Sequence, residues 1–83
     1  MLINENWAVS EKRIREFFRC QEDVTELENT FLFRSCRITL SALPNAQNGL
    51  FSCPRTQVRM EGLEEDVQMI HRRFFLRFLS AGG

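Results

Sequence analysis

The clearest hydrophobic pattern lies in the last third of the chain. Apolar residues recur there at intervals that place five of them on one side of a helix: Leu63, Val67, Ile70, Phe74 and Phe78. Acidic residues come first in this segment and arginines come later, which is the order that the helix dipole favours. The pattern predicts a helix that begins near residue 63, with His71 and Phe75 at the margin of its buried face.

A second helical pattern follows Ser10, whose hydroxyl is suited to cap the first turn of a helix. Charged residues occupy one side of this helix, and the opposite side holds Ile14, Phe17, Phe18 and Gln21. Because apolar residues continue at helical spacing as far as Phe31, the helix either runs to about residue 28 or ends near residues 21–23. Residues 1–9 are expected to form an N-terminal arm.

Between these two segments the hydrophobic period changes to two, which is the spacing of a half-buried strand. Alternate residues are apolar from Cys36 to Leu43, and residues 44–49 have the composition of a turn. A second strand follows over residues 50–60, with inward positions for Thr56, Val58 and Met60. Pro54 lacks an amide donor, so it predicts an edge position or a bulge in this strand.

Together these elements predict a small two-layer α+β domain with the order helix–β-hairpin–helix (αββα). Two helices packed on one face of the antiparallel hairpin would bury all the apolar stripes. The 83 residues are enough for a single domain over residues 1–83, and residues 80–83 are expected to form a flexible tail. Because a lone hairpin is a thin sheet, pairing of two hairpins in a homodimer would extend it and cover more apolar surface.

Composition narrows the classes of function. Eleven acidic and eleven basic residues give a formal net charge of zero, which provides no general attraction to nucleic acid or anionic lipid. No apolar run approaches the length of a membrane span, and the first residues lack the pattern of a signal peptide. The cysteines are three, an odd number, so reduced thiols in a cytoplasmic protein are expected.

No group of residues predicts a reaction, a cofactor or a metal. The candidate zinc ligands are Cys20, Cys36, Cys53 and His71, which are spaced 16, 17 and 18 residues apart. Structural zinc sites usually draw their ligands from closely spaced pairs instead. Cys36 lies on the apolar side of its strand, where a thiol packs as a small hydrophobic group. The sequence therefore predicts a non-enzymatic protein with neither cofactor nor metal.

A partner-binding surface is expected on the exposed side of the last helix. Met69 and Leu76 are seven residues apart, so they lie one above the other on the side away from the core, beside Arg72 and Arg73. Two aligned apolar residues, one of them a methionine, suit the seam of another helix. We therefore interpret the chain as a protein–protein interaction or regulatory module that forms a homodimer, with Glu65 of one copy near these arginines of the other.

The alternative interpretation is a protein that binds RNA or single-stranded DNA. The outward positions of the two strands include Arg37, Arg55 and Arg59, and Phe31 and Phe33 would share that face if the first strand extended back to them. Arginines beside aromatic rings on a sheet suit single-stranded nucleic acid, through phosphate contacts and base stacking. The zero net charge weighs against this alternative.

Overall fold

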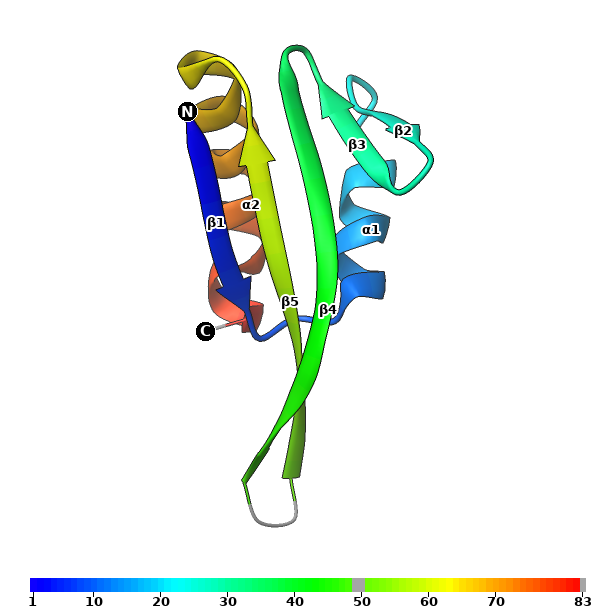
Figure 1. The fold of residues 1–83 in the computed structure, drawn as a ribbon, viewed down its shortest axis with the longest axis vertical. Coiled ribbons are helices and arrows are strands. Elements are labelled where there is room, and N and C mark those ends of the chain that lie inside the picture. The colour runs from blue at the N-terminus through cyan, green and yellow to red at the C-terminus, as the bar shows by residue number, and fades with distance from the viewer. Residues whose placement is uncertain (49–50, 83) are drawn as a thin grey trace.

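The computed structural model describes the backbone of residues 1–48 and 51–82, and the side chains of residues 1–44 and 53–79. In this part of the chain the elements are β1 (Leu2–Trp7), α1 (Glu11–Arg19), β2 (Thr25–Leu27), β3 (Thr30–Phe33), β4 (Cys36–Asn48), β5 (Phe51–Glu61) and α2 (Glu64–Gly82). The strands form one antiparallel sheet in the order β1-β5-β4-β3-β2, and both helices lie behind it in the view of Figure 1. One face of the sheet therefore packs against helices, and the other carries none from the described residues.

The predicted α+β class is confirmed, but the predicted αββα order of elements is wrong. Residues 2–7 are not an N-terminal arm; they form β1, an edge strand that pairs with β5 from Leu2 opposite Glu61 to Trp7 opposite Thr56. The alternation of β1 is hidden in the sequence because a charged residue, Glu5, occupies an inward position. The observed order is therefore strand, helix, four strands, helix.

The segment that follows α1 forms two short strands instead of a longer helix. Ser10 caps α1 as predicted, since its hydroxyl oxygen accepts the amide of Arg13 (3.3 Å). The helix ends at Arg19, so the shorter of the two alternatives is confirmed. Glu28 (φ 58°) and Arg34 (φ 53°) adopt left-handed backbone conformations, and the chain reverses at each of them, on either side of β3.

The long β4–β5 hairpin matches its prediction closely. Inward residues of the two strands meet in register and are buried: Ile38 with Met60, and Leu40 with Val58. The register shifts between Leu43 and Ala46, so an irregularity lies beside Pro54 as predicted, but its extra residue belongs to β4, where Pro44 and Asn45 stand against Pro54 alone. β4 continues to Asn48, so most of the predicted turn is strand, and Gly49 of that turn lies outside the described residues.

Aromatic rings fill the space between the helices and the sheet. The largest fully buried side chains are Phe18, Phe31, Phe33, Phe74 and Phe78. The Phe74 ring lies among them, with its centroid 4.9 Å from that of Trp7, 5.2 Å from that of Phe78 and 5.8 Å from that of Phe18. Phe74 therefore joins α1, α2 and β1 in one cluster.

Hydrogen bonds fix the start of α2 to the turn between β3 and β4. Ser35 donates its hydroxyl (2.6 Å) and its amide (3.2 Å) to the Asp66 carboxylate, and the Leu63 amide donates to the Ser35 hydroxyl oxygen (3.0 Å). The Ser35 hydroxyl holds the pKa of Asp66 below its ordinary value. Gly62 lies directly against this turn, where a Cβ atom would stand 2.6 Å from the Ser35 carbonyl oxygen.

Two predictions about the ends of α2 are corrected. Leu63 precedes the first helical residue and its side chain is 62% exposed, so its predicted place in the core is wrong. Residues 80–82 continue the helix instead of forming a flexible tail, and Gly83 lies outside the described residues. The other four residues of the predicted stripe are buried, which confirms the inward face of α2.

Candidate interaction surfaces

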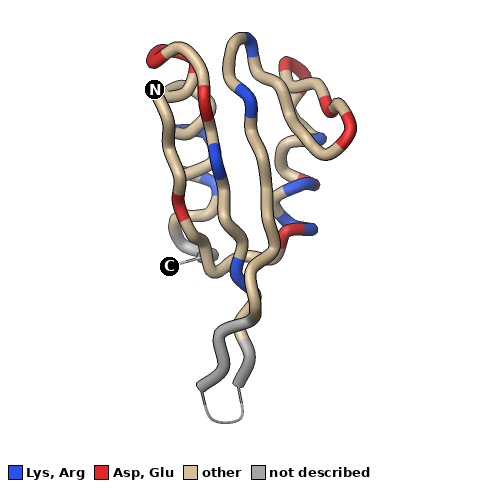
Figure 2. Tube along the Cα trace, in the orientation of Figure 1, with Lys and Arg blue, Asp and Glu red and all other residues tan. Residues whose placement is uncertain are grey.

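The sheet face directed away from the helices, which we call the outer sheet face, is polar. The strands β4 and β5 present there Arg37, Thr39, Ser41, Arg55, Gln57, Arg59 and Glu61. Register places Thr39 opposite Arg59, and the Arg59 guanidinium donates to the Glu61 carboxylate (3.0 Å). Of the charged residues on this face three are basic and one, Glu61, is acidic, and Figure 2 shows these positions along β4 and β5.

The predicted aromatic part of this face lies elsewhere. Phe31 and Phe33 are fully buried on the helix side of the sheet, so their expected place beside the outward arginines is wrong. The turn at Arg34 makes β3 a separate strand, and its pairing sets Phe31 opposite the inward residue Ile38. Among the described side chains, no aromatic ring lies on the outer sheet face, so Phe31 and Phe33 provide no base stacking there.

The side of α2 directed away from the core carries several apolar side chains. We call this surface the α2 outer face; it consists of Glu65, Met69, Arg72, Phe75, Leu76 and Leu79. Its apolar members are exposed by 40% at Met69, 38% at Phe75, 63% at Leu76 and 51% at Leu79. The sequence predicts Met69 and Leu76 here but misses Leu79, although the spacing 69-72-76-79 continues the same helical stripe.

A shallow hollow lies at the start of the α2 outer face. It is lined by Leu63, Glu64, Glu65 and Gln68. The exposed side chain of Leu63 therefore shares this hollow with Glu65, which is the first residue of the α2 outer face.

Arg73, predicted to bind a partner, is occupied within the chain. Its guanidinium donates to the Asp23 carboxylate (2.9 Å) and lies 5.1 Å from the centre of the Phe33 ring. The hydrogen bond from Arg73 holds the pKa of Asp23 below its ordinary value. Arg73 therefore joins α2 to the segment after α1, whereas Arg72 is exposed on the α2 outer face.

His71 joins α2 to the edge strand β1. Its Nε2 atom lies 2.9 Å from Oε1 of Glu5, and the same oxygen accepts the indole N–H of Trp7 (3.1 Å). The His71 ring centroid lies 6.0 Å from that of Phe75, as expected for a residue at the margin of the buried face. These contacts explain how an acidic residue is accommodated on the inward side of β1.

The cysteines lie apart from one another. Cys36 is buried, and burial raises the pKa of its thiol to about 11, whereas Cys20 and Cys53 are exposed. Within the described residues no three His, Cys, Asp or Glu side chains are placed to hold a metal ion together. Cys36 therefore packs as a small hydrophobic group, as its strand position predicts.

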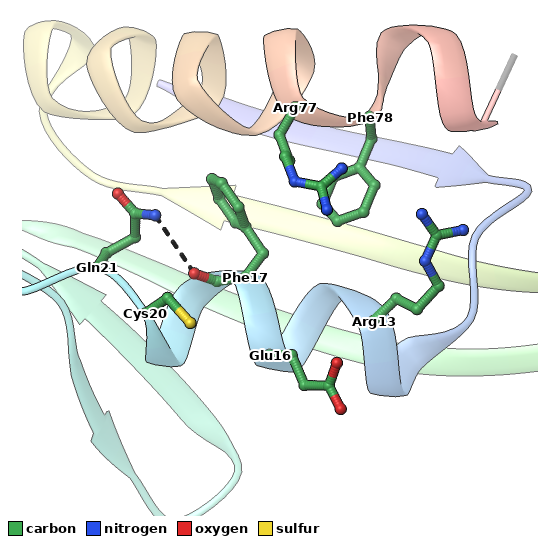
Figure 3. Close-up of a pocket in the computed structure, with 7 residues that line it drawn as sticks. All are labelled: Arg13, Glu16, Phe17, Cys20, Gln21, Arg77 and Phe78. Atoms are coloured by element: carbon green, nitrogen blue, oxygen red, sulfur yellow. Dashed lines mark hydrogen bonds between the residues drawn. The ribbon is translucent and has the colours of Figure 1, made fainter.

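A groove between α1 and α2 was not predicted from the sequence. It is lined by Arg13, Glu16, Phe17, Cys20, Gln21, Arg77 and Phe78 (Figure 3). The two helices run in opposite directions, so the start of α1 lies beside the end of α2 (Figure 1). No local pattern connects residues this far apart in the chain, and only the fold brings Arg13 and Arg77 to one groove.

Comparison of the sequence with family models and with curated proteins gives no relative. No protein-family model matches the chain, and its sequence matches no curated protein.

In the part of the chain that the structure describes, neither helix has both the length and the apolar character that crossing a membrane requires. The surfaces described above are therefore the basis for a function.

Proposed function

We propose that this protein is a small non-enzymatic interaction module that self-associates through the α2 outer face. The observation that supports this proposal is the joint exposure of Met69, Phe75, Leu76 and Leu79 on a helix whose opposite side fills the core. A helix that is apolar on two sides needs two apolar neighbours, and the sheet supplies only one of them.

The arrangement of groups along α2 favours a second copy in antiparallel orientation. Leu63 and Leu76 lie at nearly equal distances along the chain from Met69, six residues before it and seven after it. With a two-fold axis near Met69, Leu76 of one copy would enter the hollow beside Leu63 of the other, and the reverse contact would form at the same time.

The charges on the α2 outer face agree with the same orientation. Glu65 precedes Met69 and Arg72 follows it, so an antiparallel pair would bring Glu65 of one copy close to Arg72 of the other at two symmetric positions. A parallel pair would instead bring like charges together, which is unfavourable. Apolar and charged groups therefore favour one register of self-association.

Light scattering over a hundredfold dilution range tests this proposal. We expect a dimer at micromolar concentration and a monomer for Leu76→Glu, because the new carboxylate would be buried in the contact without a partner. Leu27→Glu is the matched control, since Leu27 is similarly exposed (60%) but lies on β2. Glu65→Arg should weaken the dimer, and adding Arg72→Glu should restore it.

Two results would contradict the proposal. A monomer mass for the wild-type chain at every concentration would exclude self-association in this range. A dimer that is insensitive to both Leu76→Glu and Glu65→Arg would place the contact elsewhere, for example at the free edge of β1.

Binding of RNA or single-stranded DNA on the outer sheet face is the second candidate. It is favoured by Arg37, Arg55 and Arg59, which lie on a sheet face that no described helix covers. It is weakened by the burial of Phe31 and Phe33. Titration with a single-stranded oligonucleotide distinguishes the two candidates, because affinity that depends on phosphate contacts falls steeply as salt rises.

A further inference from the structure

Two arginines from different helices converge on one aromatic ring. The guanidinium carbon of Arg13 lies 5.7 Å from the centre of the Phe78 ring, and that of Arg77 lies 5.3 Å from it. Figure 3 shows both side chains directed toward Phe78, Arg13 from α1 and Arg77 from α2. Cation–π contacts of this kind orient the guanidinium groups and limit their freedom.

Neither of these positive charges is paired with an acidic side chain within the described residues. None of the ion pairs formed there involves Arg13 or Arg77. Glu16 lines the same groove, but Figure 3 shows its carboxylate directed away from the two guanidinium groups. Two positive charges beside one ring would both attract an anion that enters the groove next to that ring.

The rest of the groove is lined by the Phe17 ring, by Cys20 and by the polar side chain of Gln21. Phe17 lies next to Phe78, with ring centroids 5.6 Å apart, and Cys20 follows one turn later. The Gln21 side chain stands at the far end, where its amide donates to the carbonyl oxygen of Phe17 (3.4 Å). From Arg13 to Arg19, the last residue of α1, the helical rise gives a length of about 9 Å, and Gln21 lies just beyond the helix.

The ion pair between Asp23 and Arg73 connects the segment after α1 with α2, and neither residue lines the groove. The groove has a volume of about 370 Å³. A short groove with a charged end suits a small molecule better than a long polypeptide segment.

We propose that the α1–α2 groove binds a small organic acid that has one carboxylate and an apolar body. The carboxylate takes up hydrogen bonds from Arg13 and Arg77, since guanidinium groups match the planar geometry of a carboxylate. The apolar body lies along Phe17 toward Cys20. This site is separate from the proposed self-association, because its residues belong to the side of α2 that faces α1.

Titration with octanoate, followed by amide chemical shifts in NMR spectra, tests the site. We expect shifts at the groove residues, and weaker binding of octanol, which lacks the charge, and of acetate, which lacks the apolar body. Arg13→Gln and Arg77→Gln should each weaken octanoate binding about tenfold or more, since each removes a charge-assisted hydrogen bond. Arg72→Gln is the matched control on the outer side of the same helix.

A second measurement does not depend on the arginine variants. Cys20 is exposed in the groove, so octanoate should slow its alkylation by iodoacetamide, whereas the exposed Cys53 of β5 should react at an unchanged rate. Equal affinities for octanoate and octanol that do not change in Arg13→Gln and Arg77→Gln would overturn the proposal. Absence of any shift or protection at millimolar octanoate would overturn it as well.

Discussion

Replacing Phe74 by alanine removes the ring that joins both helices to the sheet. Phe74 is fully buried, and its ring contacts those of Trp7, Phe18 and Phe78. Its contact with Phe18 is nearly parallel, with 9° between the ring planes, and the Trp7 contact is edge-on at 77°. The substitution therefore leaves a cavity and several unmatched aromatic surfaces at the centre of the core.

The expected cost of Phe74→Ala is roughly 3–5 kcal/mol, the range measured for buried phenylalanine in other proteins. Aromatic pairs add to the loss of buried area, so the upper part of this range applies. A chain of 83 residues has a total stability of about 4–12 kcal/mol at the usual value per residue. We therefore expect the variant to lose a large part of its stability, and its urea midpoint to fall accordingly.

Phe75→Ala is the matched control for this experiment. Phe75 is the next residue of the same helix, but it is 38% exposed and its ring contacts those of Trp7 and His71 at the margin. We expect this variant to lose about 1 kcal/mol or less, because partly exposed residues leave no closed cavity. Both should be compared by urea denaturation at low protein concentration, where self-association does not contribute.

The comparison of the two adjacent phenylalanines gives a clear criterion. A similar loss of stability in both variants would mean that α2 does not present Phe74 to the core in the orientation described. A loss below about 1 kcal/mol for Phe74→Ala would refute the central position of this ring.

Two further predictions concern the start of α2. Gly62→Ala should destabilise the protein by roughly 1–3 kcal/mol in urea denaturation, because the added Cβ would stand 2.6 Å from a backbone oxygen of Ser35. Ser41→Ala serves as a control, and unchanged stability of Gly62→Ala would contradict this packing. Since the pKa of Asp66 is lower in the folded state, its ionised form contributes stability that is present above about pH 4 and lost as the pH falls through the folded-state pKa. The urea midpoint of the wild type should therefore fall more on acidification than that of Asp66→Asn, and equal falls would refute this role.

The elements that the sequence predicts well are those with strong and regular periods. The inward faces of β4, β5 and α2 follow from alternation and helical spacing, because each packs against the core along most of its length. An irregularity beside Pro54 is predictable from chemistry, since proline has no amide to donate to the sheet, although its extra residue lies in β4 and not in the strand of Pro54. Ser10 as the cap of α1 is predictable for a similar local reason.

The elements that the sequence misses depend on contacts with distant residues. β1 places Glu5 inward, and this becomes acceptable only because His71 and Trp7 approach the carboxylate. In the sequence Phe31 continues a helical spacing, but the backbone is left-handed at Glu28 and Arg34 and the chain reverses at both residues. Phe31 therefore lies in the short strand β3. Local patterns carry no information about such partners, so the predicted order of elements fails at these segments.

The candidate sites also divide into those that local sequence patterns predict and those that depend on contacts between distant residues. Met69 and Leu76 are predictable because helical spacing alone separates the outer side of α2 from its core side. The role of Arg73 depends on Asp23, and the convergence of Arg13 and Arg77 depends on the antiparallel course of the two helices. Contacts between elements that are far apart in the chain decide which arginines are available to a ligand.

The two proposals follow from one property of α2, which offers more apolar surface than a domain of this size buries. Its inner side, around Phe74, is covered by the sheet and α1, while Leu76 and Leu79 remain exposed on its outer side. Between these two sides lies the flank that meets α1, where Arg77 covers the ring of Phe78. A single helix thus contributes to the core, to a small-molecule groove and to a self-association surface, and substitutions one residue apart, at Leu76 and Arg77, should separate the last two functions.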